Sequence, residues 1–110
     1  MAIPESEMRK TLKAVGAFLE KRRRESESKT SLRASISNSE VVILASEVDS
    51  DKRKSREYPV ARMRWFNSRK IWRLFWIGDD RKWHAYYSYP EAARIATHLR
   101  TVDEVFLDSA

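Results

Sequence analysis

The strongest constraint on the fold is the stretch from residue 58 to residue 89, which holds all four tryptophans and all four tyrosines of the chain. Within it, positions that are all apolar or aromatic alternate with positions that include the arginines. An alternation with a period of two is typical of strands whose two faces have different surroundings. Turn-forming residues interrupt this alternation at 67–70 and at 78–81. The stretch therefore predicts a three-stranded antiparallel meander, with strands over about 58–66, 71–77 and 82–88.

The alternation also predicts how the three strands pair. If each turn closes a four-residue loop, Phe66 lies opposite Ile71, and Ile77 lies opposite Lys82. One face of the sheet, the tryptophan face, is then entirely apolar or aromatic. A slip of one residue in either hairpin would mix the two faces, so the pattern favours this register. The predicted tryptophan face comprises Ala61, Met63, Trp65, Trp72, Leu74, Trp76, Trp83, Ala85 and Tyr87.

The opposite side of the sheet, the arginine face, combines basic side chains with rings. In the predicted register Arg64 lies opposite Arg73, and like charges directly opposed on a sheet are destabilising. Either acidic side chains from elsewhere in the chain neutralise this pair, or an anionic ligand binds it. Arginine stems that lie flat on rings are a structural use of the same residues. The predicted arginine face comprises Val60, Arg62, Arg64, Phe66, Ile71, Arg73, Phe75, Ile77, Lys82, His84 and Tyr86.

The segment before the meander predicts a helix and a hairpin. Apolar residues recur at helical spacing from Met8 to Leu19, which predicts a helix over 4–24. The basic run at 21–24 suits the negative end of the helix dipole, and the alternative is a phosphate-contacting patch. Strands over about 31–36 and 41–48 form the hairpin, and the unbroken apolar run at 41–44 indicates burial on both faces.

The remaining segments complete an α+β fold in one domain of 110 residues. Residues 49–57 read as a charged loop, either solvated or serving as a binding arm. Pro90 is expected to open a short helix over 90–100, and the apolar residues after it to dock on the core. The prediction is an N-terminal helix, a mostly antiparallel sheet of about five strands and a short C-terminal helix.

Composition limits the compartment and the partners. The formal net charge of +6 suits an anionic partner and also suits plain solubility. Without cysteine the chain has no disulfide and no thiolate metal site, so a reducing compartment fits. It has no apolar run of membrane-spanning length and no N-terminal segment of the signal-peptide kind. We expect a cytoplasmic protein without a membrane partner.

The middle of the chain resembles a family of small bacterial proteins described as a domain of unknown function, number 3024. The overlap is strongest over VARMRWFNSRKIWRLFWIGDDRKWHAYY, where Lys82, Trp83 and His84 match a Lys-Trp-His that opens a strand in the family. The arginine-rich end of the first helix is also similar. Glu25 and its neighbours stand where the family usually has prolines, and the tail at 105–108 matches poorly. The resemblance implies the fold and no particular activity.

Catalytic and metal sites find little support in the sequence. His84 and His98 are the only histidines, and the basic surroundings of His84 disfavour a metal ion. The carboxylates at 40, 47, 49, 51 and 57 have no spacing that fixes a catalytic pair. With only two glycines, a glycine-rich phosphate loop is excluded. We therefore expect a protein that is not an enzyme and has no cofactor; a nuclease-like hydrolase is the third alternative.

The arginine face favours nucleic-acid binding, because cations can contact phosphates and rings can stack on bases. We expect weak, salt-dependent binding of DNA or RNA that tolerates many sequences. The same face is also apolar enough to form a homodimer or to receive an acidic protein partner, which is the second alternative. The residues expected to bind nucleic acid are Arg62, Arg64, Arg73, Phe75, Lys82, His84 and Tyr86.

Overall fold

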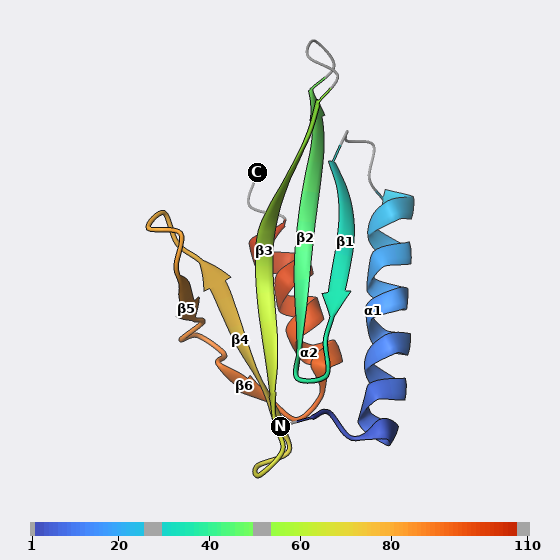
Figure 1. Cartoon of the computed structure of the whole chain (residues 1–110), viewed down its shortest axis with the longest axis vertical. Helices are drawn as coiled ribbons and strands as arrows, with labels where there is room; N and C mark the ends of the chain where they lie inside the picture. Colours follow the sequence, from blue (N-terminus) through green and yellow to red (C-terminus); the bar gives the residue numbers. More distant parts are fainter. Residues whose placement is uncertain (1, 26–29, 50–53, 108–110) are drawn as a thin grey trace.

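The computed structural model describes residues 2–25, 30–49 and 54–107 of the chain. These residues form an α+β protein, as the sequence predicts, with helical segments before and after one sheet (Figure 1). In chain order the elements are α1 (Glu5–Glu25), β1 (Thr30–Ile36), β2 (Glu40–Asp49), β3 (Lys54–Phe66), β4 (Ile71–Ile77), β5 (Trp83–Ala85), β6 (Glu91–Ala92), α2 (Ile95–Thr101) and a final π-helical turn, η1 (Val102–Phe106).

The strands form one antiparallel sheet in the order β1-β2-β3-β4-β5, and the short β6 also pairs with β4. This topology confirms the predicted hairpin followed by a three-strand meander. α2 lies behind the sheet in the view of Figure 1, while α1 runs along β1 and packs against α2. Both helices therefore contribute to the core on one side of the sheet.

The core lies between the helices and the tryptophan face. Alternate residues of the central strands are buried there, because their side chains point to the same side of a pleated sheet. The buried sheet residues include Val41, Ile43, Ala61, Met63, Trp65, Trp72 and Leu74, and the helical segments add Val15, Phe18, Ile95, Leu99 and Val102. Trp72 is fully buried, packs on Trp65 with ring centroids 5.2 Å apart, and donates a hydrogen bond from Nε1 to the Glu7 carboxylate at 3.3 Å.

The expected burial of β2 on both faces is wrong. Val41 and Ile43 are fully buried, but Val42 and Leu44 point to the arginine face and are only half-buried. The helices contribute to the core on the other side of the sheet, so the apolar run of β2 is enclosed on one side alone. The run therefore leaves apolar surface next to the arginines.

The predicted register of the first hairpin of the meander is confirmed. Phe66 pairs with Ile71, Arg64 with Arg73 and Arg62 with Phe75. The four-residue turn at 67–70 closes with its last residue in the left-handed region, at a φ of 52°.

The predicted register of the second hairpin is wrong by one residue. Ile77 pairs with Trp83 rather than with Lys82, because Gly78 and Lys82 are themselves hydrogen-bonded and leave a three-residue loop. Arg81 takes a positive φ of 62° at the end of this loop, which is the usual way to close three-residue hairpins. The Asp80 carboxylate accepts the Lys82 N–H at 3.0 Å and fixes the loop.

This slip exchanges the faces of the last strand. Ala85 pairs with Phe75 and so lies on the arginine face, together with Trp83. His84 pairs with Trp76, which places it on the tryptophan face, where Tyr86 follows two residues later.

Several strand limits also differ from the predicted ones. β3 begins at Lys54 rather than near residue 58, because it continues to pair with β2 as far as Asp49. The centre of the predicted charged loop, residues 50–53, lies outside the described part of the chain. β5 covers only Trp83–Ala85 of the expected strand 82–88.

The C-terminal helix starts later than expected. Pro90 does not open it, because the Pro90 carbonyl accepts a hydrogen bond from the Leu74 N–H at 3.0 Å and leads into β6. The helix begins only at Ile95. Most of the apolar residues after it dock on the core as predicted: Val102 is fully buried, and Phe106 and Leu107 pack against the core, but Val105 is 45% exposed.

His98 on α2 is fully buried and connects this helix to β4. Its Nε2–H donates to the Trp72 carbonyl oxygen at 2.7 Å, and its Nδ1 has no hydrogen-bond partner among the described residues. Burial lowers the pKa of His98 below its usual 6.5, because the charged imidazole would lose its hydration. The folded protein therefore favours the neutral ring.

We expect the free energy of unfolding to decrease as the pH falls below about 6.5, where the unfolded chain takes up a proton at His98 before the folded protein does. This contribution is intact above that pH, and one such group limits the slope to about 1.4 kcal/mol per pH unit. Urea unfolding between about pH 5 and 7.5 should give a flatter profile for His98→Gln than for the wild type. Parallel profiles would contradict the assignment.

Candidate functional site

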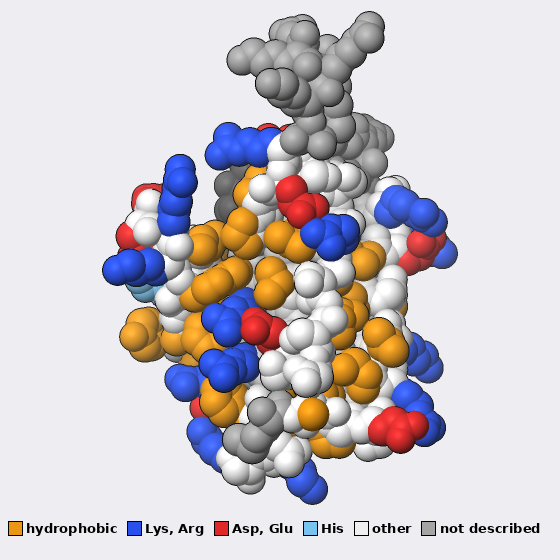
Figure 2. Space-filling model, in the orientation of Figure 1, with side chains coloured by type: hydrophobic (Ala, Val, Ile, Leu, Met, Phe, Trp, Pro, Cys, Tyr) orange, Lys and Arg blue, Asp and Glu red, His pale blue; other side chains and the backbone are white. Residues whose placement is uncertain are grey.

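The candidate site is the arginine face of the sheet, because no described helix covers it. Figure 2 views this face and shows hydrophobic and basic side chains side by side over the middle strands. Arg64 is exposed, whereas the apolar residues around it are half-buried by their neighbours on the sheet: Val60, Phe66, Ile71, Phe75 and Ile77. The site is thus an open, mixed surface rather than a cleft.

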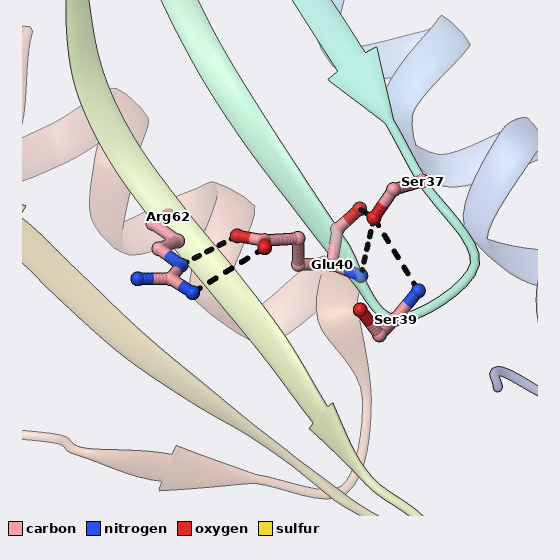
Figure 3. Close-up of polar contacts among 4 residues, drawn as sticks. All are labelled: Ser37, Ser39, Glu40 and Arg62. Atoms are coloured by element: carbon pink, nitrogen blue, oxygen red, sulfur yellow. Dashed lines mark hydrogen bonds and ion pairs between the residues drawn. The ribbon is translucent and has the colours of Figure 1, made fainter. Parts of the chain in front are cut away.

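Arg62 is held by a carboxylate of the same sheet. Its Nε and Nη2 donate to the two carboxylate oxygens of Glu40, with Nη2 at 3.3 Å (Figure 3). Ser37 fixes the turn that positions Glu40, since its Oγ accepts the backbone N–H groups of Ser39 and Glu40 at 3.4 and 3.2 Å. Both side chains of the ion pair are largely buried, so Arg62 is a structural cation as well as a surface one.

Arg64, unlike Arg62, is not held by a carboxylate of the described sheet. Glu40 is its cross-strand neighbour on β2, yet the Glu40 carboxylate bonds to Arg62. Within the described part of the chain, Arg64 makes no ion pair. Its guanidinium carbon lies 5.8 Å from the centroid of the Phe66 ring, within the range of a cation–π contact. The charge is therefore available to a ligand.

Arg73 lies opposite Arg64 and contacts the same ring, with its guanidinium carbon also 5.8 Å from the Phe66 centroid. Its Nε is buried and forms no hydrogen bond with the described residues. The nearest carboxylate oxygen is that of Glu91 at 3.7 Å, which is within ion-pair distance but beyond hydrogen-bond distance. Glu91 itself accepts two hydrogen bonds from Arg69, both at 2.9 Å. Two opposed arginines thus share one ring, and neither is fully neutralised.

Three of the predicted site residues stand apart from this cluster. His84 lies on the tryptophan face, where it stacks on Trp76 with ring centroids 5.0 Å apart. Its Nε2 is hydrogen-bonded to the Asp80 carboxylate at 3.0 Å, which holds the pKa of Asp80 below its usual value. Tyr86 packs against the Phe106 ring on the same side of the sheet. Lys82 is exposed in the loop before β5.

The remaining predicted residues do come together. Phe75 lies beside Arg62, whose guanidinium carbon is 5.8 Å from its ring centroid. Together with Arg64 and Arg73, these residues form a continuous part of the arginine face across β3 and β4. Sequence reasoning placed Phe66 on this face but did not count it among the binding residues, although its position between two arginines was visible in the predicted register.

The basic end of α1 is partly neutralised by acidic groups, because four cations share two carboxylates. Lys21 and Arg22 contact Asp103 of η1 at 3.2 and 2.9 Å. The two arginines that follow in the helix both contact Glu20. On the sheet, Arg33 forms a two-point hydrogen-bonded pair with Glu57 at 2.7 and 3.1 Å. On the arginine face, Arg64 has no ion-pair partner among the described residues.

Metal and membrane sites are not indicated in the described parts of the chain. Among these residues, no group of three or more histidine and carboxylate side chains is arranged to hold a metal ion. No described helix is both long enough and apolar enough to cross a membrane.

Fold and site together define a small α+β protein that leaves one basic and aromatic face of an antiparallel sheet open. The chain belongs to the family described as Domain of unknown function (DUF3024), whose sequence profile matches residues 3–105. This match confirms the resemblance seen in the sequence. Searches of curated proteins and of solved structures with this chain found no match.

Proposed function

We propose that the protein is a non-enzymatic binding protein for single-stranded nucleic acid, DNA or RNA, and that the ligand lies across the arginine face. The observation that carries this proposal is the pair of opposed arginines, Arg64 and Arg73, whose guanidinium groups both lie over the Phe66 ring on the arginine face. Like charges directly opposed on a sheet are destabilising, so a sheet selected for stability alone would more readily place a neutral or acidic residue opposite one of them. A phosphate group supplies the missing negative charge.

The rings explain why a single strand is preferred. Phe66 and Phe75 are only half-buried and lie next to the guanidinium groups. Unpaired bases can stack on such rings, whereas the bases of a duplex are already stacked on each other. Stacking and phosphate contacts depend little on the base, so the binding tolerates many sequences.

A homodimer through the same face is the competing function, and the half-buried Val42, Ile71 and Ile77 favour it. In a two-fold symmetric dimer the same patch meets itself. The uncompensated arginines of one copy would then approach those of the other, and desolvating like charges is costly. Charge therefore favours an anionic ligand over a second copy.

The test is fluorescence anisotropy with labelled oligothymidine, oligouridine and a duplex of the same length, combined with light scattering of the free protein. We expect a monomer that binds the single strands with dissociation constants of roughly 10⁻⁶ to 10⁻⁴ M and the duplex more weakly. Comparison of the two single strands separates RNA from DNA preference. A stable dimer that binds none of the three at low salt would overturn the proposal and support the homodimer.

A further inference from the structure

Glu91 lies where a ligand phosphate would be expected. The two-residue strand β6 pairs with β4 so that Glu91 is the cross-strand partner of Arg73. Its carboxylate receives two parallel hydrogen bonds from Arg69, each 2.9 Å long, which is the way a guanidinium group also grips a phosphate. The Glu91 side chain is 30% exposed, so solvent and ligand can reach it.

The same carboxylate leaves Arg73 incompletely satisfied. Both of its oxygens are engaged by Arg69, and the closer one is 3.7 Å from the Nε of Arg73. That Nε is buried and forms no other hydrogen bond within the described residues. A buried donor without an acceptor is unfavourable, so Arg73 gains when an anionic oxygen comes within hydrogen-bond distance of its Nε.

We propose that Glu91 is an intramolecular competitor of the nucleic-acid ligand, and this inference rests on the proposed function. A phosphodiester group of the bound strand replaces the Glu91 carboxylate at Arg73 and is shared with Arg64, the cation opposite. Glu91 keeps the guanidinium groups of Arg69 and Arg73 in place when the face is empty. It also lowers the affinity of the ligand, because an oligonucleotide has to displace it.

Displacement is feasible because the Arg69 end of the ion pair is largely exposed. The Arg69 side chain is 65% exposed, and exposed pairs contribute little net stability in water. The Arg62–Glu40 pair is more buried and makes a poorer candidate for exchange. The competition therefore acts at the Arg73 end of the site and leaves Arg62 in its structural role.

The matched comparison is Glu91→Gln against Glu57→Gln. Each variant removes one negative charge from a carboxylate that receives two hydrogen bonds from an arginine of the same sheet. Only Glu91 neighbours Arg73. We expect labelled oligothymidine to bind Glu91→Gln about five-fold more tightly than the wild type, and Glu57→Gln less than about two-fold more tightly. In an Arg73→Gln background, the gain from Glu91→Gln should shrink to less than about two-fold.

The outcomes separate the inference from the proposed function. Equal gains for the two glutamine variants, with measurable wild-type binding, would overturn the competitor and leave the nucleic-acid interface intact. If Glu91→Gln were the only protein of the series to bind measurably, the result would support both the competitor and the proposed function. Failure of every variant to bind at low salt would overturn both. Thermal unfolding of each variant shows whether an affinity change comes from a loss of folded protein.

Discussion

Replacing Trp72 with alanine is expected to lower the free energy of unfolding by about 3–5 kcal/mol, the cost of removing a large buried aromatic side chain. Trp72 is 0% exposed, packs on Trp65, and ties the sheet to α1 through its hydrogen bond to Glu7. The alanine variant loses all of these contacts and leaves a cavity at the centre of the core. Because single domains are stable by about 5–15 kcal/mol, this loss is a large fraction of the total.

The control is the same substitution at Trp76, which lies four residues further along β4 on the same face of the sheet. Trp76 is 40% exposed, and its stacking partner is His84 at the edge of the sheet. We expect its replacement by alanine to cost clearly less, about 1 kcal/mol, because the residue is already 40% exposed and loses less buried surface. Urea unfolding followed by far-ultraviolet circular dichroism measures both variants. Equal losses would mean that the tryptophan face is not packed as described.

Replacing Arg64 and Arg73 together with glutamine is expected to weaken the binding of a single-stranded oligonucleotide about ten-fold at low salt. The double variant removes the two opposed charges over the Phe66 ring, but leaves the ring and the ion pair of Arg62 in place. Stability should be unchanged or slightly higher, because the repulsion between opposed cations is relieved. Anisotropy titrations and thermal unfolding measure the two effects.

A second double variant, which loses two positive charges away from the sheet, controls for the effect of net charge on affinity. Arg23 and Arg24 are exposed at the end of α1 and both contact Glu20. Replacing these two with glutamine changes the net charge by the same amount but leaves the sheet untouched. We expect a change in affinity of less than about two-fold. If the helix variant lost as much affinity as the sheet variant, binding would follow overall charge and not the arginine face.

The first hairpin of the meander could be predicted from sequence because its alternation tolerates only one register. Moving Trp72 by one position would have brought it to the arginine face, so the hydrophobic pattern and the four-residue turn agree. The same argument failed for the second hairpin, whose loop is one residue shorter than the expected four. Its loop closes through Arg81 at a positive φ, and a non-glycine residue in that conformation gives no clear signal in the sequence. One residue fewer in the loop exchanged the faces of His84 and Tyr86.

The cation pair of the site could be predicted, and its acidic neighbours could not. Arg64 and Arg73 face each other because of the hairpin register alone, which is local information. Glu40 reaches Arg62 diagonally across β2 and β3, and the choice between Arg62 and Arg64 depends on side-chain geometry. Glu91 was assigned to a helix, so its position beside Arg73 depends on the unexpected strand β6. Contacts between distant segments decide these details.

The salt dependence of oligonucleotide affinity, measured for the wild type and for the Arg64→Gln/Arg73→Gln variant under the same conditions, tests the central claim most directly. If both arginines contact phosphates, the plot of log affinity against log salt concentration should be shallower in the variant by about 1.4, the value for two phosphates on a single strand. Identical slopes for the two proteins would mean that these arginines contact no phosphate and would contradict the proposed interface.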